Sequence, residues 1–132
     1  MKGFTSNISK TLSLETVMPC TDNSGAKMVH IIGALKYRGT RGRNLSVGVG
    51  DVVIVSIRKG KPDMVKKVVK ALIVRQKKEY RRANGTRILF EDNAAVLVND
   101  DFLPVGTEIK GVVAREIAER FPKVAAISAG VV

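Results

Sequence analysis

The fold is most constrained by a series of short segments rich in valine and isoleucine, each ended by residues that favour turns. β-branched residues fit a pleated, half-buried strand, whereas Gly, Asn, Asp and Pro interrupt it. Strands are therefore predicted over Leu12–Met18, Lys27–Lys36, Asp51–Arg58, Val65–Arg75, Arg87–Glu91 and Ala94–Val98. About five or six short antiparallel strands must cover their own edges, so the pattern predicts a mainly β fold built on a small closed barrel.

The pair Asn84-Gly85 is the strongest turn signal, because Asn and Gly accept the positive φ angles of a tight hairpin turn. It predicts a hairpin between the strands Val65–Arg75 and Arg87–Glu91. The cation-rich segment Gln76–Ala83 would extend this hairpin away from the barrel as a projecting β-ribbon.

The pattern changes near the end of the chain. Glu108–Ala114 is expected to be a last strand, and Arg115–Phe121 carries apolar residues four apart, on one face of a helix. Lys123–Ala129 is a second short apolar piece, so one or two short helices are expected. With 132 residues and no repeat or linker, we expect one domain, 1–132, with a barrel over 1–113 and a short helical tail over 114–132 packed on it.

Composition excludes several classes of protein. The longest apolar runs have four or five residues, against the ~20 that a membrane-spanning helix needs, and no apolar stretch of signal-peptide length lies near the N-terminus. Cys20 is the only cysteine and His30 the only histidine, so no intramolecular disulfide and no Cys/His zinc site can form. We expect a cytoplasmic protein with no membrane contact, no metal and no cofactor.

The charge is strongly positive and unevenly distributed. The formal net charge is +11, but residues 1–87 contribute +14 and residues 88–132 contribute −3. Two stretches concentrate the cations: 36–43 has four in eight residues, and 58–87 has 12 against two carboxylates. A chain this basic usually has a polyanionic partner. One side is therefore expected to bind phosphates and the C-terminal end to face a protein.

Few aromatic residues are available to stack on bases. Aromatic residues make up 5% of the chain, so contacts to the backbone and shape of folded, double-helical RNA are favoured over base stacking. Two roles are open for Tyr80: it could stack on a base or ribose, or it could cap the core. The glycines between Arg38, Arg41 and Arg43 let the backbone approach a phosphate chain.

No constellation of catalytic residues is evident. Cys20 and His30 are expected to be packed structural residues. The adjacent carboxylates Glu91-Asp92 and Asp100-Asp101 would point to opposite faces of an extended strand, which does not suit paired acid–base work. The Gly48-Val49-Gly50 run lacks the third glycine of a dinucleotide-binding fingerprint, and no Walker loop is present. We therefore expect no enzymatic activity.

Several ordered blocks together carry a family resemblance that covers about residues 12–132. They are Ala71-Leu72-Ile73-Val74, Asn84-Gly85, Phe90, Asn93 and Val96-Leu97 with gaps of nine, four, two and two residues, together with Asp22–Lys27, Gly48–Asp51, Pro104–Thr107, Gly111 and Arg115-Glu116. In this order and spacing they resemble the L14 family of universal large-subunit ribosomal proteins. The N-terminal lead and the Arg38–Leu45 insertion are closer to the archaeal and eukaryotic branch.

The resemblance implies a five-stranded barrel with a projecting β-ribbon and a small C-terminal helical part. It also implies direct binding to large-subunit rRNA, a place at the face that meets the small subunit, and a contribution to intersubunit bridges with small-subunit rRNA. Neighbouring large-subunit proteins would pack on the chain, and an anti-association factor could dock there. Glu108 stands where bacterial members often carry a basic residue, so a bacterial silencing-factor contact is not carried over.

Candidate site residues fall into two groups. Contacts with rRNA are expected from Lys27, Lys36, Arg38, Arg41, Arg43, Arg58, Lys59, Lys61, Lys66, Lys67, Arg75, Lys77, Lys78, Tyr80, Arg81 and Arg82. Contacts with proteins are expected from Glu108, Arg115, Glu116, Glu119 and Phe121. The turn at Asn23–Ala26 is also expected to lie against RNA.

Two other functions stay open on the residues alone. A free OB-like binder of single strands, acting as a factor or chaperone, would need strong base stacking, which the scarcity of aromatic residues disfavours. A small nucleic-acid-processing enzyme would need a metal-ligand or acid–base cluster formed in space. Neither alternative accounts for the ordered blocks.

Overall fold

The computed structural model describes residues 6–35, 37 and 39–132 and is mainly β, as predicted. Its strands are β1 (Leu12–Ser13), β2 (Val17–Pro19), β3 (Ala26–Ala34), β4 (Ser46–Val47), β5 (Val52–Gly60), β6 (Val68–Arg75), β7 (Tyr80–Arg81), β8 (Arg87–Ile88), β9 (Ala94–Val98), β10 (Ile109–Val113) and β11 (Ser128–Val131). Its helices are α1 (Arg115–Arg120) and α2 (Pro122–Ala126).

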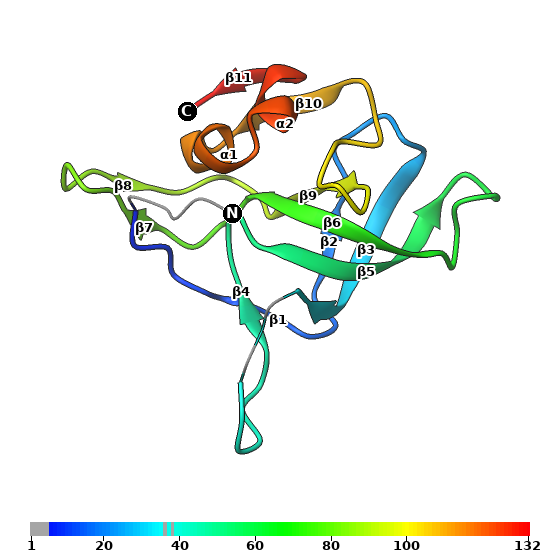
Figure 1. Cartoon of the computed structure of the whole chain (residues 1–132), viewed down its shortest axis with the longest axis horizontal. Helices are drawn as coiled ribbons and strands as arrows, with labels where there is room; N and C mark the ends of the chain where they lie inside the picture. Colours follow the sequence, from blue (N-terminus) through cyan, green and yellow to red (C-terminus); the bar gives the residue numbers. More distant parts are fainter. Residues whose placement is uncertain (1–5, 36, 38) are drawn as a thin grey trace.

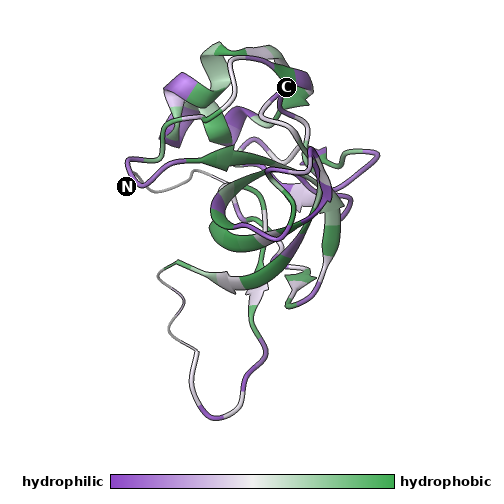
Figure 2. Cartoon of the chain, turned by 90° about the vertical axis from the view of Figure 1, so that its right-hand side faces the viewer, coloured by the Kyte–Doolittle hydropathy of each residue, from purple (hydrophilic) through white to green (hydrophobic). Residues whose placement is uncertain are grey.

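The central sheet is antiparallel, with the strand order β2-β3-β5-β6-β9 (Figure 1). Its two edge strands meet at one point, just beyond the end of β2. Cys20 and Ala95 form an isolated parallel bridge, and the backbone N–H of Thr21 donates to the Ala95 carbonyl oxygen at 3.0 Å. The sheet is strongly curved beneath the two helices (Figure 2).

Alternate residues of the central strands enter two separate apolar clusters. Val53 and Ile73 belong to the cluster enclosed by the curved sheet. Leu72 and Val74 face the other way and pack in a second cluster with Ile117 of α1. Strands β6 and β9 are therefore buried on both faces, which explains why Ala94–Val98 is a continuous apolar run rather than an alternating one.

The C-terminal tail packs on the outer face of the sheet. The predicted helix is confirmed as α1, and its apolar residues Ile117 and Phe121 are both buried. The second short helix is α2, as expected, but the chain then continues as β11, which was not predicted and runs parallel to β10 with Ile109 opposite Ser128. A four-residue strand paired across the fold leaves no periodic signal in its own sequence.

The hairpin prediction is correct at its tip and wrong at its base. The Gly85 backbone has φ +87°, and its N–H donates to the Arg82 carbonyl oxygen at 2.9 Å. However, β8 pairs with β7, whereas β6 pairs with β9. Buried Gln76 is where the chain leaves the sheet: its side-chain Oε1 accepts from the N–H of Val49, and its Nε2 donates to the Ser9 and Lys78 carbonyl oxygens.

The first predicted strand, Leu12–Met18, is divided into β1 and β2. Glu15 lies between them with φ +65°, a left-handed conformation that cannot continue a strand. β1 leaves the central sheet and pairs with β4, and β2 pairs with β3. The two pieces thus belong to different sheets, although the sequence between them contains no glycine or proline.

Candidate nucleic-acid interface

Six exposed cations gather where the β5–β6 turn meets the start of β3. This turn patch consists of Lys27, Arg58, Lys59, Lys61, Lys66 and Lys67. The N–H of Lys61 donates to the Gly25 carbonyl oxygen at 2.9 Å, and Lys59 lies opposite Met28 in the β3–β5 pairing. These contacts bring Lys27 beside the turn. Within the described residues, no carboxylate forms an ion pair with the patch, so its charges are available to an anion.

The ribbon formed by β7 and β8 carries a second group of exposed cations: Lys77, Lys78, Arg81 and Arg87. Among the described residues, one ion pair involves this group: Oε1 of Glu79 lies 3.9 Å from Nη1 of Arg87. An exposed pair at this distance contributes little, so both charges stay available. The ribbon projects from the opposite side of the molecule to the β5–β6 turn (Figure 1).

The loop between β3 and β4 holds a third group. Arg41 and Arg43 are exposed, and the hydroxyl of Tyr37 donates to the Asn44 carbonyl oxygen at 3.0 Å, across the loop. The predicted contacts Lys36 and Arg38 lie outside the described residues. The part of this loop that the structure describes extends away from both the ribbon and the β5–β6 turn (Figure 1).

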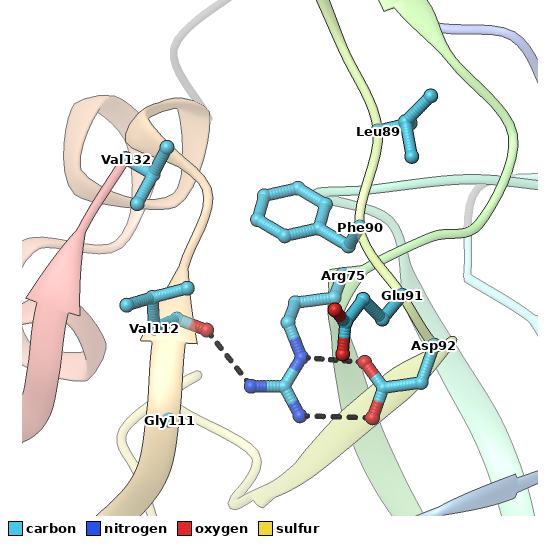
Figure 3. Close-up of a pocket in the computed structure, with 8 residues that line it drawn as sticks. All are labelled: Arg75, Leu89, Phe90, Glu91, Asp92, Gly111, Val112 and Val132. Carbon is cyan, nitrogen blue, oxygen red and sulfur yellow. Dashed lines mark hydrogen bonds and ion pairs between the residues drawn. The ribbon is translucent and has the colours of Figure 1, made fainter.

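The structure corrects the predicted role of Arg75, because its guanidinium forms an ion pair within the fold. Its side chain is 11% exposed, and its Nε and Nη2 lie 3.0 and 3.2 Å from the two carboxylate oxygens of Asp92. Its Nη1 donates to the Val112 carbonyl oxygen (Figure 3). The guanidinium thus ties β6 to β10 in the wall of a pocket of about 740 Å³, and it has no free edge for a phosphate.

A second correction concerns Tyr80 and Arg82, which point inward from the ribbon. The Tyr80 ring is 1% exposed, so of its two open roles the structure shows the core position. Its hydroxyl donates to Glu116 at 2.7 Å, and Nε of Arg82 donates to the same carboxylate at 2.9 Å. Burial raises the pKa of the Tyr80 hydroxyl, and the contact with Glu116 raises it further.

Two of the predicted protein contacts are also buried. Glu116 is 1% exposed and Phe121 is 6% exposed, so neither reaches a partner in this conformation. Alternating charged and apolar residues in a short helix leave the direction of each side chain undetermined by sequence, and here α1 turns Glu116 toward the ribbon. Glu108 and Arg115 are exposed and Glu119 is half-buried.

The turn after β2 is held mainly by internal contacts, although it was expected to face RNA. Buried Asp22 accepts hydrogen bonds from the N–H of Leu97 at 3.0 Å and from the hydroxyl of Ser24 at 2.6 Å. Asn23 accepts from the N–H of Thr107 at 2.8 Å. The blocks Asp22–Lys27 and Pro104–Thr107, which are far apart in sequence, therefore contact each other. Sequence reasoning could have found this from the polar side chains that cap turns.

Cys20 is a buried thiol within this same cluster. Its Sγ donates to Asp22 at 3.1 Å. Burial, followed by the charge and the hydrogen bond of Asp22, raises the pKa of the thiol from 9.0 to about 12. Since the thiolate is the nucleophile, this environment keeps Cys20 inert.

We expect Cys20 to react with a thiol-specific reagent about a thousandfold more slowly in the folded protein than in the denatured protein, as its raised pKa implies. Stopped-flow absorbance with an aromatic disulfide at pH 8 measures both rates.

Because the pKa of Cys20 is raised in the folded protein, the stability that this group contributes is present below pH 9 and is lost as the pH rises toward 12. Equal rates in the two states would contradict the burial of Cys20.

The described residues hold no catalytic or metal-binding constellation. No group of three or more His, Cys, Asp or Glu side chains lies close enough to hold a metal ion. The ring Nδ1 of His30 accepts a hydrogen bond from Nε of Arg58 at 3.2 Å, on the outer face of the sheet. In the same part of the chain, no helix is long and apolar enough to cross a bilayer.

Exposed cations on three projecting segments are the arrangement expected of a small β protein with a polyanionic partner. The sequence profile of the family described as "Ribosomal protein L14p/L23e" matches residues 11–132. The chain therefore belongs to this family of ribosomal proteins. It is a structural component rather than an enzyme, and it works in the cytoplasm as part of the ribosome.

Archaeal relatives match over nearly the whole chain. "Large ribosomal subunit protein uL14" of Methanocorpusculum labreanum is 50% identical over 128 residues, which cover 97% of each protein. The protein of the same name from Methanothrix thermoacetophila is 47% identical over 132 residues, the full length of both. These similarities confirm the resemblance found from the ordered blocks, including its place in the archaeal and eukaryotic branch.

Proposed function

We propose that this chain is a structural constituent of the large ribosomal subunit that binds large-subunit rRNA directly. The observation that carries this proposal is the turn patch, in which six exposed cations gather and none of them forms an ion pair with a carboxylate of the described residues. Lysines in this state repel one another, and phosphates that neutralise them release counterions. The names of the relatives from two archaea support the same assignment.

The placement of the cations favours contact with separate RNA segments. The β5–β6 turn and the ribbon project from opposite sides of the molecule, and the loop that carries Arg41 and Arg43 projects in a third direction (Figure 1). One straight helix cannot follow all three. We infer that the chain joins segments of large-subunit rRNA and contributes a contact with small-subunit rRNA across the subunit interface.

The revised set of rRNA-binding residues contains only exposed cations. Within the described residues it consists of Lys27, Arg41, Arg43, Arg58, Lys59, Lys61, Lys66, Lys67, Lys77, Lys78, Arg81 and Arg87. Arg87 is new to the set, because its position on β8 beside Arg81 makes it part of the ribbon's outer face. Arg75 and Tyr80 leave the set because they are buried, and Arg82 leaves it because its guanidinium is bound to Glu116 and to the Val132 carbonyl oxygen.

We further propose that the central sheet closes into a barrel and that residues 1–132 form one domain. The bridge between Cys20 and Ala95 and the hydrogen bond from the N–H of Leu97 to Asp22 support closure, because they join the segment after β2 to β9. A closed barrel removes the free edges of the sheet and gives the projecting cations a rigid base.

The acidic end of the chain suits protein neighbours. Exposed Glu108 and Arg115, together with half-buried Glu119, lie on or beside the C-terminal tail. RNA would be repelled by the net negative charge of residues 88–132. We propose that neighbouring large-subunit proteins pack on this end and that an anti-association factor can dock there.

Binding of the purified chain to three RNAs tests the proposal: large-subunit rRNA, small-subunit rRNA and an unstructured single strand of equal length. We expect the tightest binding to large-subunit rRNA, with a steep loss of affinity as salt rises. Filter binding between 50 and 400 mM salt measures both quantities. A preference for the unstructured strand would instead support the free single-strand-binding factor.

A further inference from the structure

A buried carboxylate lies where the ribbon meets the C-terminal tail. The side chain of Glu116, in α1, accepts hydrogen bonds from the hydroxyls of Tyr80 and Ser6, both at 2.7 Å, and from Nε of Arg82 at 2.9 Å. Nη2 of Arg82 also donates to the carbonyl oxygen of Val132 at 2.6 Å. One carboxylate thus joins the N-terminal segment, the ribbon and the helical tail.

The ribbon has few other attachments along its outer part. β7 and β8 pair with each other over only two residue pairs, and their sheet is separate from the central sheet. The N–H of Asn7 adds one bond to the Arg81 carbonyl oxygen. The base of the ribbon is held independently, since the N–H of Lys77 donates to the Asn93 side chain at 2.8 Å. Tyr80 and Ile88 also pack on the apolar cluster beneath α1, and Glu116 adds the polar contacts that fix the ribbon against that helix.

Such a cluster contributes more to the orientation of its partners than to the stability of the fold. A buried ion pair loses much of its Coulombic gain to desolvation, so it adds little net stability compared with apolar packing. A fully hydrogen-bonded pair nevertheless permits only one arrangement of its partners. Burial raises the pKa of the Glu116 carboxyl, but the hydrogen bonds from Arg82, Ser6 and Tyr80 outweigh it and hold the pKa below its ordinary value. The carboxylate is therefore ionised at neutral pH.

We propose that Glu116 is a positioning residue that orients the ribbon, so that its exposed cations Lys77, Lys78, Arg81 and Arg87 meet RNA as one surface. Tyr80 and Arg82 are the ribbon residues that bind Glu116, and they act through Glu116 without touching RNA. The inference rests on the proposed function, since it assumes that the ribbon binds rRNA.

The test compares Glu116→Gln with Glu108→Gln, which removes the same charge from an exposed position of the same end of the chain. Amide hydrogen exchange in the full chain is the first readout. In E116Q we expect the amides of residues 79–88 to exchange about tenfold faster, while those of β5, β6 and β9 keep their protection. In E108Q neither group should change. Tyr80→Phe removes one ribbon contact without touching the carboxylate, and it should give a smaller change of the same pattern.

Affinity for large-subunit rRNA is the second readout. E116Q is expected to bind about tenfold more weakly, since the ribbon's cations no longer reach RNA together. Arg81→Glu with Arg87→Glu should lower affinity while leaving hydrogen exchange unchanged. Exchange in E116Q equal to that in E108Q, or a uniform rise through the central sheet, would overturn the positioning role. If E116Q frees the ribbon but neither it nor the double variant changes affinity, the positioning role stands and RNA binding by the ribbon fails.

Discussion

Replacing Lys59, Lys61, Lys66 and Lys67 together by Glu is expected to lower the affinity for large-subunit rRNA by about a thousandfold at 0.1 M salt. Each lost phosphate contact removes ~0.9 from the slope of log affinity against log salt for a duplex, so four contacts lower the slope by about 3.6. All four side chains are exposed, so folding should be unaffected. Filter binding across a salt series measures both the affinity and the slope.

The matched control reverses Lys110 and Lys123, two exposed lysines outside the three basic segments. This control changes the net charge by four instead of eight, so a single long-range effect of charge would produce about half of the loss in log affinity. A local phosphate contact predicts almost no loss. If the control weakens binding in proportion to its charge, the turn patch is not the RNA surface.

Asp22→Ala is expected to lower the free energy of unfolding by about 3 kcal/mol and the Tm by about 10 °C. Asp22 is 7% exposed, and its loss leaves the buried N–H of Leu97 without an acceptor. The substitution also removes the charge and the hydrogen bond that help to raise the pKa of the Cys20 thiol, so the reactivity of this thiol should rise. Urea denaturation followed by circular dichroism measures the stability.

Asp22→Asn is the conservative variant, because its amide oxygen can still accept from Leu97. It should recover more than half of the stability lost in Asp22→Ala. Asp63→Ala is the comparison for an exposed aspartate of a turn, and it should change stability by less than about 0.5 kcal/mol. If Asp22→Ala is as stable as Asp63→Ala, the contact between Asp22, after β2, and Leu97 of β9 does not hold the sheet closed.

The strands of the central sheet could be predicted because their signals are local. Val52–Gly60 and Ala94–Val98 are β-branched runs ended by turn residues, and the structure places strands there within about two residues of the prediction. β4 and β11 could not be predicted, because each is short and exists through a partner distant in sequence. The same limit explains the hairpin base, where buried Gln76 redirects the chain through contacts with Ser9 and Val49.

The candidate interface was predictable in its charge but not in its exposure. A run such as Arg81-Arg82 looks uniform in sequence, yet strand alternation sends Arg81 outward and Arg82 inward to Glu116. Reversing the charge of both arginines would therefore combine two different effects. Reversal of Arg81 tests RNA contact, and reversal of Arg82 breaks a buried ion pair. Only the distant partner, Glu116, distinguishes them, and its position depends on the tertiary fold.

A protein that is an integral part of the large ribosomal subunit stays bound to that subunit during fractionation. A sucrose gradient of a cell lysate, probed for the chain before and after a high-salt wash, tests this property most directly. We expect one copy per large subunit, found in the large-subunit and assembled-ribosome fractions and retained after the wash. Recovery of the chain mainly in the free fraction would contradict an integral place in the subunit and favour a dissociable RNA-binding factor.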